Sequence, residues 1–222
     1  MDLPTWTAYF FASILIAISP GSGAVLAMSH GLNFGVRRAG ATIAGLQTGL
    51  LVILLVAGAG VGSLLIASET AFNIVKTAGA LYLLWIGLSQ WRAAPVAPAP
   101  AEDAVGVAAP AGLQGTPRRL FLSGFLTNVT NPKGIVFMVA VLPQFITDSR
   151  PLAPQLAIIA VTTLGVDAVV MHGYAFAASR LQAFFRDAQA MKAQNRVFGG
   201  LLMAVGAGLF FVKRTAHASP GA

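Results

Sequence analysis

Long stretches without charge, separated by short charged segments, dominate the sequence. Residues 3–36 and 39–68 contain no Asp, Glu, Lys or Arg, and each stretch exceeds the about 20 residues that a helix needs to cross a bilayer. Residues 70–91, 120–147 and 151–179 hold one charged residue each, which are Lys76, Lys133 and Asp167. The last apolar run, 197–212, is short, but its flanking basic residues can reach the membrane interfaces. The pattern predicts an all-α polytopic membrane protein with six transmembrane helices.

Composition supports a membrane protein and excludes a water-soluble one. Of the 222 residues, 56% are hydrophobic and 9% are charged, whereas a soluble domain carries about 25% charged residues. The net charge of +7 lies in segments between apolar runs and in no nucleic-acid-reading motif, so nucleic acid is not an expected partner. The sequence contains no cysteine, which excludes disulfides and thiolate metal sites.

The distribution of Lys and Arg among the loops predicts the orientation. With six spans, one side of the membrane collects most of the basic residues, namely Arg37, Arg38, Arg92, Arg118, Arg119, Arg180, Arg186, Lys192 and Arg196. The other side holds Arg150, Lys213 and Arg214. Because cytoplasmic loops are enriched in Lys and Arg, both termini are expected outside. A cleaved signal peptide ending near Ser29 is disfavoured, since only Asp2 carries a side-chain charge before the long apolar run.

The spans divide the chain into two halves joined by a linker. Residues 1–92 form the first three-helix repeat and residues 119–214 the second, followed by a tail at 215–222. Residues 93–118 are rich in Ala and Pro, and we expect a flexible cytoplasmic linker there. Residues 180–196 place basic side chains among Leu and Phe, which predicts a short interfacial amphipathic helix.

Two proline tripeptides occupy corresponding positions in the two halves. Ser19-Pro20-Gly21 interrupts the first span and Asn131-Pro132-Lys133 interrupts the fourth, 112 residues later. Since each half has an odd number of spans, the halves enter the membrane from opposite sides, as in the inverted repeats of many secondary transporters. Helices 1 and 4 are therefore expected to be broken at proline.

Each tripeptide is expected to begin a half-helix inside the membrane. Proline lacks an amide donor and pushes the preceding residue out of the helical region, while Ser and Asn are preferred N-cap residues. Ser19 and Asn131 would then cap half-helices whose unbonded amides attract a carboxylate or another anion. Gly21 and Gly23 would let a ligand approach the backbone closely. The alternative is that each proline only kinks a packed helix.

Two charged side chains are expected at membrane depth, where charge is costly and is rarely retained without a function. Lys133 follows the second break and is placed to attract a substrate carboxylate or to neutralise Asp167. Asp167 lies near the middle of span five and is the candidate for carrying a proton or binding a substrate ammonium group. A static structural pair of Asp167 and Lys133 is the alternative. Lys76 is nearer a span end and is expected to reach the interface.

Two uncharged side chains add further candidates. Gln47 lies between Gly45 and Gly49, and this face of small residues predicts the close packing of another helix. Gln47 is either a hydrogen-bond donor into a cavity or the partner in an interhelical hydrogen bond. His172, five residues after Asp167, is more readily structural than part of a proton path.

Several motifs resemble those of one known family. Residues 18–25 (ISPGSGAV) and 31–40 (GLNFGVRRAG) are similar to the amino-terminal signature of the lysine exporter superfamily, in its homoserine and threonine resistance branch. Residues 79–87 (GALYLLWIG) resemble the third-span motif of that family. Residues 124–137 (GFLTNVTNPKGIVF) and 142–145 (LPQF) resemble its fourth-span block.

The resemblance implies a bacterial inner-membrane exporter of an amino acid or a close derivative, driven by the proton gradient. An intramembrane Asp167 suits the fifth span of the family. One departure is Ser22, because the family usually has a second proline after Ser-Pro-Gly. This change frees an amide donor and adds a hydroxyl, which leaves room for a substrate other than the commonest ones. We expect no enzymatic activity, cofactor or metal, and the apolar helix faces leave a homo-oligomer open.

The expected mechanism is alternating access, in which the two halves rock about a midplane cavity built from Ser19 and Asn131. A zwitterionic substrate would place its carboxylate on the half-helix amides and Lys133. Its ammonium would face Asp167 or Gln47, and protonation of Asp167 from outside would help to release it.

Two other classes of function compete with a carrier. A passive pore or a non-transporting membrane scaffold is the main alternative. A membrane serine hydrolase with Ser22 as nucleophile and His172 as base is a remote third interpretation. It is disfavoured because Pro20 stands where the nucleophile turn needs a glycine and cannot donate to an oxyanion.

Overall fold

The structure is a computed structural model that describes residues 1–67, 69–93, 115–147, 149–180 and 188–211. Within these ranges all regular secondary structure is helical, which confirms the predicted all-α class. In chain order the elements are α1 (Leu3–Ile18), α2 (Ser22–Phe34), α3 (Val36–Ala67), α4 (Glu69–Arg92), α5 (Pro117–Val129), α6 (Pro132–Val141), the 3-10 turn η1 (Leu142–Gln144), α7 (Leu152–Arg180) and α9 (Ala188–Phe211).

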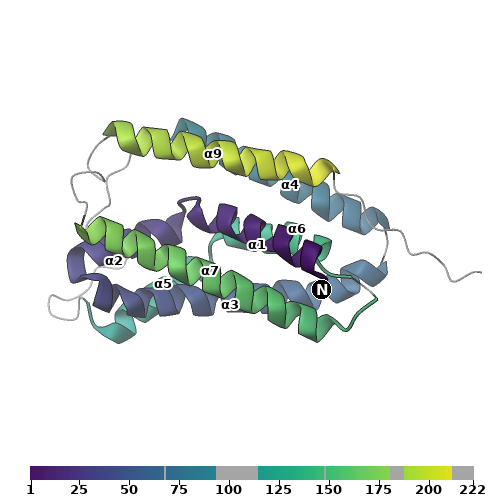
Figure 1. The fold of residues 1–222 in the computed structure, drawn as a ribbon, viewed down its shortest axis with the longest axis horizontal. Helices are drawn as coiled ribbons and strands as arrows, with labels where there is room; N and C mark the ends of the chain where they lie inside the picture. Colours follow the sequence, from purple (N-terminus) through teal and green to yellow (C-terminus); the bar gives the residue numbers. More distant parts are fainter. Residues whose placement is uncertain (68, 94–114, 148, 181–187, 212–222) are drawn as a thin grey trace, which may run out of the picture.

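The helices lie in two layers. α4 and α9 run side by side along one edge of the molecule, and the other helices form the larger layer beneath them (Figure 1). Glycine lets the two helices of the smaller layer touch backbone to backbone. A Cβ atom on Gly87 would lie 2.7 Å from the Gly199 carbonyl oxygen, a separation that side chains essentially never adopt. α4 is thus held mainly to α9.

Within the larger layer, α3 and α5 approach each other as the small-residue face predicted. A Cβ atom on Gly49 would lie 2.8 Å from the Phe125 carbonyl oxygen, and one on Gly45 would overlap the Phe121 carbonyl. The predicted close packing of a helix on this face is therefore confirmed. The main core lies between α1, α3, α4, α6, α7 and α9, and its fully buried members include Phe137.

Two helix pairs are sharply bent where the sequence has its proline tripeptides. α1 and α2 are inclined to each other by 58°, and α5 and α6 by 51°. Ser19–Gly21 separates the first pair, which we call the first break, and Thr130–Asn131 separates the second pair, which we call the second break. Each break lies between two apolar helices that together are long enough to cross a membrane.

The first break differs in one detail from the expectation. Ser19 ends α1 and does not cap α2: its N–H still donates to the Leu15 carbonyl at 3.3 Å, and the N-cap of α2 is Gly21. Pro20 lies between the two helices and does not occupy the first position of α2, as Pro132 does in α6. The new helix therefore begins at Ser22, later than predicted.

The described residues contain up to four candidate membrane spans. α3 (over Val36–Gly60) and α7 (over Leu152–Arg180) are long and apolar enough alone, and each bent pair qualifies when its two helices are counted together. Within the described residues, α4 and α9 do not meet the same test of length and apolar composition. The number of six spans stays a prediction.

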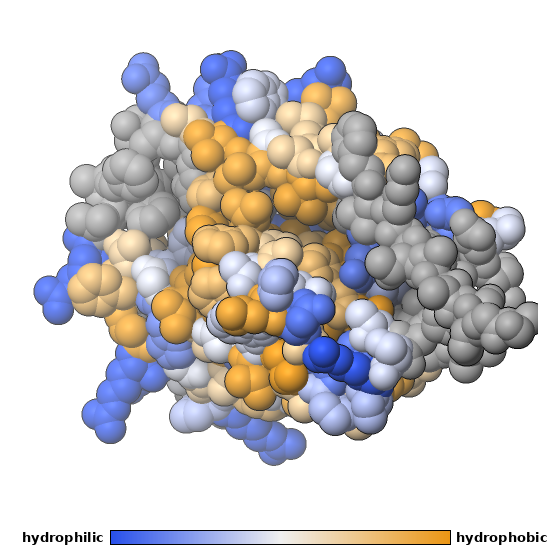
Figure 2. Space-filling model, turned by 45° about the vertical axis from the view of Figure 1, so that its right-hand side comes forward, coloured by the Kyte–Doolittle hydropathy of each residue, from blue (hydrophilic) through white to orange (hydrophobic). Residues whose placement is uncertain are grey.

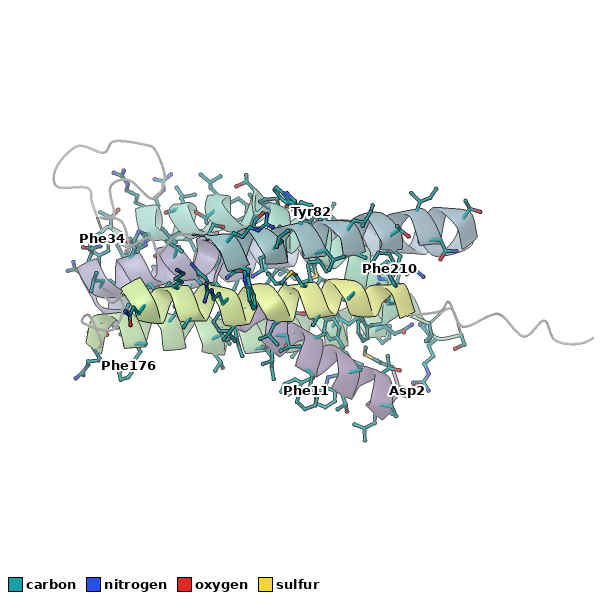
Figure 3. All side chains as sticks on the ribbon, turned by 90° about the horizontal axis from the view of Figure 1, so that it is seen from above. Asp2, Phe11, Phe34, Tyr82, Phe176 and Phe210 are labelled. Carbon is teal, nitrogen blue, oxygen red and sulfur yellow. The ribbon has the colours of Figure 1, made fainter. Side chains whose placement is uncertain are left out.

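The outer surface of the bundle is apolar. Figure 2 shows hydrophobic side chains over much of the visible face, with long hydrophilic side chains projecting from its edges. On α7, Val161 and Val169 are each 74% exposed. Figure 3 shows Phe11 and Phe176 at the rim of the bundle, and both side chains are exposed. Such a surface suits lipid rather than water.

Two expectations about the connecting segments meet different outcomes. Residues 188–196 were expected in a short interfacial helix, but they form the first turns of α9, which continues to Phe211. The helix is continuous because this stretch contains neither proline nor glycine to end it before Gly199. The linker residues 94–114, the segment 181–187 and the tail 215–222 lie outside the described residues.

Candidate functional site

A cavity of about 70 Å³ lies where the two breaks meet. Its polar lining comes from both halves of the chain and consists of Ser13, Ser19, Asn128, Asn131, Lys133, Thr163 and Asp167. Its apolar wall includes Leu50 of α3 and Phe137 of α6. Residues 112 positions apart in the sequence thus border one cavity. It has room for a few water molecules and is therefore large enough for polar groups to bind.

Lys133 connects the second break to the first. Its Nζ donates hydrogen bonds to the carbonyl oxygens of Ser19 at 2.6 Å and of Ile16 at 3.3 Å. These carbonyls lie at the C-terminal end of α1, where no following helical amide donates to them and where the helix dipole is negative. The ammonium group therefore both completes the hydrogen bonding of α1 and neutralises its dipole.

Two further side chains bind the same stretch of backbone. The Tyr174 hydroxyl of α7 donates to the Ile18 carbonyl at 2.5 Å, and Gln90 Nε2 of α4 donates to the Pro20 carbonyl at 3.2 Å. Gln90 Oε1 in turn accepts from the Ser19 hydroxyl at 3.2 Å. Donors from α4, α6 and α7 thus satisfy the carbonyls that the broken helix leaves open.

The start of α2 is left open on the amide side. Its N-cap Gly21 provides no side chain, and no side-chain hydrogen bond caps the first turn. Gly21 and Gly23 both line the cavity. Since the amides of a first helical turn attract anions, this end of α2 is where a carboxylate entering the cavity would find donors.

At the second break, residues near the proline form most of the hydrogen bonds themselves. Asn131 Oδ1 accepts from the Lys133 amide at 3.1 Å and so caps α6, as the sequence predicted for this residue. The Asn131 amide donates to the Asn128 carbonyl at 2.9 Å. Asn128, which is buried, also donates from Nδ2 to the Leu46 carbonyl of α3 at 2.7 Å. The backbone of this break is satisfied within a few residues of the proline.

Asp167 faces the cavity from α7 and is held from α3. Gln47 Nε2 donates to Asp167 Oδ2 at 2.6 Å, whereas Gln47 Oε1 is buried without a hydrogen-bond partner. Lys133 lines the same cavity, but its hydrogen bonds go to the α1 carbonyls and not to Asp167. Opposite charges therefore share one space without the direct static pair that was the alternative.

The predicted site residues separate into two groups. Those that line the cavity are Ser19, Gly21, Gly23, Asn131, Lys133 and Asp167. Pro20 and Pro132 shape the breaks, and Gln47 reaches the cavity only through Asp167. The Ser22 side chain is exposed and lies outside the lining. Ser22 therefore adds its hydroxyl to the outside of α2 and not to the cavity.

His172 takes no part in the cavity. Its side chain is exposed, and its Nδ1 lies 2.8 Å from the Ala168 carbonyl one turn earlier in α7. This favours the structural role over a proton path. No hydrogen bond joins His172 to Ser22, as a serine hydrolase would require. Within the described residues, no group of three or more His, Asp or Glu side chains is arranged to hold a metal ion.

Five polar residues in or beside the cavity were missed by sequence reasoning. They are Ser13, Gln90, Asn128, Thr163 and Tyr174. Asn128 carried a usable signal, because a second asparagine precedes the Asn-Pro break by three residues. Gln90 and Tyr174 carried none, since they approach the first break from helices distant in sequence and bind backbone carbonyls, which leave no trace in the side-chain pattern.

The chain matches a known family and several named relatives. The family model described as "LysE type translocator" matches residues 14–212. The chain is 45% identical over 207 residues to a homoserine/homoserine lactone efflux protein of Salmonella typhi, covering 93% of this chain and 96% of the relative. It is 33% identical over 141 residues to a leucine efflux protein of Klebsiella pneumoniae, covering 64% and 63%. No solved structure matches.

Proposed function

The chain belongs to the LysE-type translocator family, and from this membership we propose that it is a secondary-active exporter of an amino acid or an amino-acid derivative from the cytoplasm. It is an amino-acid efflux transporter built of membrane helices, and not an enzyme. The cavity at the two breaks supports the binding of a zwitterion, and the named relatives support the choice of substrate.

Both breaks border one cavity, and this shared border carries the proposal. An amino acid is a zwitterion, and the cavity offers complementary groups for both of its charges. The open amides at the start of α2, with Lys133 close to Gly21, suit a carboxylate. Asp167 suits an ammonium group. Both the carboxylate and the ammonium group of a bound zwitterion are thereby paired with groups of opposite charge in the cavity.

Alternating access of two inverted three-helix halves is the proposed mechanism. Each bent pair counts as one span, so that α1–α2, α3 and α4 correspond to α5–α6, α7 and α9. Several helix contacts support this correspondence, because they exchange when the halves are exchanged: α3 packs on α5 as α7 packs on α1, α3 packs on α6 as α7 packs on α2, and α4 packs on α9. A two-fold relation of this kind lets the cavity open to either side by rocking one half against the other.

We further propose a bacterial inner-membrane location with both termini outside and coupling to protons at Asp167. The loops predicted to be cytoplasmic carry most of the Lys and Arg. Asp167 is the acidic side chain that lines the cavity. A proton arriving from outside would neutralise Asp167, weaken its hold on the substrate ammonium and favour release on that side.

Homoserine is the substrate that we propose to test first. The relative named for homoserine and homoserine lactone efflux matches nearly the full chain at 45% identity, whereas the relative named for leucine efflux matches about two thirds of it at 33%. The Ser22 departure does not argue against this choice, because Ser22 lies outside the cavity lining.

Counterflow in liposomes separates a carrier from the alternative of a passive pore. Vesicles containing the purified protein are loaded with unlabelled homoserine and diluted into a trace of labelled homoserine. A carrier transiently accumulates the label above its outside concentration, and an imposed pH gradient drives net transport. Flux without accumulation would instead indicate a pore, and the absence of protein-dependent flux of any amino acid would contradict an exporter.

Asp167→Asn tests the proton-coupling role within the same assay, and Asp2→Asn is its matched control. We expect Asp167→Asn to abolish transport driven by the pH gradient. Asp2 caps α1 outside the cavity, where hydrogen bonds from Thr5 hold the pKa of its carboxyl below the ordinary value. Asn is an equally good N-cap, so this control should transport normally. Gradient-driven transport by Asp167→Asn at the normal rate would refute the role.

A further inference from the structure

Three hydroxyl groups gather at the part of the cavity wall that lies away from the breaks. Tyr9 and Ser13 belong to α1 and Thr163 belongs to α7; together we call them the hydroxyl cluster. All three side chains are buried, with exposed fractions of 1%, 1% and 4%. Ser13 and Thr163 line the cavity. The Tyr9 and Thr163 hydroxyls hydrogen-bond to each other and so join α1 to α7.

The Ser13 hydroxyl is the unusual member of the cluster. Its Oγ is buried and makes no hydrogen bond of ordinary geometry, although the Tyr9 hydroxyl lies close to it. A buried hydroxyl without a partner costs free energy and is uncommon in native proteins. Ser13 also lines the cavity, so a group inside the cavity can supply the missing partner.

The position of the cluster matches the end of a short side chain. Ser13 precedes Ser19 by six residues, about 9 Å along α1, and Thr163 precedes Asp167 by one turn, about 6 Å along α7. The cavity wall also includes apolar side chains, among them Leu50 and Phe137. An amino acid with its charged end at the breaks would therefore pass its methylene groups along an apolar wall and end at the hydroxyls.

We propose that the hydroxyl cluster determines specificity by binding a hydrogen-bonding group at the tip of the substrate side chain, with Ser13 as the residue that contacts it. The exporter then selects amino acids with a short hydroxylated side chain over apolar isosteres. This inference rests on the proposed function, because it assigns the far end of the same site. A polar pocket discriminates more sharply than an apolar one, since the wrong ligand leaves its groups unpaired.

Norvaline provides the matched ligand, because it has a methyl group where homoserine has the hydroxyl. The counterflow assay measures the apparent affinity for each amino acid, and their ratio is the readout. The wild-type protein should prefer homoserine. In Ser13→Ala the ratio should fall by about tenfold, through weaker homoserine binding and unchanged or better norvaline binding. Thr163→Val, which removes a second hydroxyl of the cluster at equal size, should shift the ratio in the same direction.

Ser123→Ala is the control, because Ser123 is likewise a buried serine whose Oγ lacks a partner but lies on α5 outside the cavity lining. Its ratio should equal that of the wild-type protein. An unchanged ratio in Ser13→Ala, or in Thr163→Val should Ser13→Ala not fold, overturns the specificity role. An equal shift in Ser123→Ala does the same. Failure of the proposed function looks different, since the wild-type protein would then show counterflow of neither amino acid.

Discussion

The two breaks arise from similar sequences but are stabilised in different ways. At the first break, the carbonyls at and just beyond the end of α1 are bound by Lys133, Tyr174 and Gln90, which come from three other helices. At the second break, Asn131 caps its own helix within two residues. The first break therefore depends on tertiary packing, whereas the second is largely a local structure.

In the proposed rocking mechanism, this difference would give each break its own part. A locally stabilised break keeps its shape when helices move, and it carries Lys133 at a fixed place at the start of α6. The first break changes its hydrogen bonding if α4, α6 or α7 shifts relative to α1. In a rocking transporter the first break would thus respond to the movement, and the second break would transmit it through Lys133.

Loss of the Lys133 ammonium should produce the largest effect of all. Lys133→Met leaves two α1 carbonyls without a donor and Asp167 without a nearby positive charge. We expect the unfolding free energy to fall by about 3 kcal/mol and transport to be lost. Thermal unfolding in detergent and counterflow measure the two effects. Lys76→Met, on α4 away from the cavity lining, is the control, and equal losses in both variants would contradict the special role of Lys133.

Gln90 should come next, because it serves the first break with two hydrogen bonds. Gln90→Leu removes the donor to the Pro20 carbonyl and the acceptor for the Ser19 hydroxyl. Two uncharged hydrogen bonds predict a loss of about 2 kcal/mol. The control is Gln144→Leu, where the amide bonds only within its own turn, to Ala140. If Gln90→Leu were as stable and active as the wild-type protein, the first break would not depend on α4.

Asn131 should show the more modest cost of a local cap. Asn131→Ala removes the acceptor for the Lys133 amide, and the loss of an N-cap costs about 1 kcal/mol. Asn131→Ser retains an uncharged capping oxygen and should recover the stability. The same thermal unfolding assay compares the two variants. A loss in Asn131→Ala larger than that in Gln90→Leu would reverse the ranking of the two breaks.

The smallest effect on stability is expected at Gly21. A substitution there should affect substrate binding more than the free energy of unfolding. A Cβ atom there would lie 3.6 Å from Lys133 Cδ, an ordinary contact, so Gly21→Ala should change the unfolding free energy by less than about 0.5 kcal/mol. The added methyl group would still enter the cavity beside the open amides of α2, and the apparent KM for homoserine should rise several-fold. An unchanged KM would indicate that substrate does not approach this backbone.

The parts of the site that the sequence could predict are those with a side-chain or proline signal. Prolines at 20 and 132 predicted where the helices bend, and isolated charges in apolar runs predicted that Lys133 and Asp167 line a cavity. The prediction that Ser19 caps α2 was wrong. Ser19 has the side chain of an N-cap residue, but its backbone amide still donates to the Leu15 carbonyl at the end of α1. Whether such a residue ends the preceding helix or caps the following one depends on the tertiary contacts around it.

The remaining contacts could not be predicted, because their partners are backbone carbonyls or distant hydroxyls. Lys133 was expected to attract a substrate carboxylate or to neutralise Asp167, and its hydrogen bonds to the carbonyls of Ile16 and Ser19 were not predicted. Ser13 looked like one small residue in an apolar run, and only burial beside the cavity without a partner distinguishes it.

Substrate protection of single cysteines tests most directly whether both breaks border one substrate site, and the chain is suited to it because it has no cysteine of its own. Gly21→Cys and Gly134→Cys place one thiol in the cavity lining beside each break, and Thr48→Cys places one on the exposed side of α3. Saturating homoserine should slow thiol labelling at the first two positions and leave Thr48→Cys unaffected. Protection at one break alone, or at neither, would contradict a shared site.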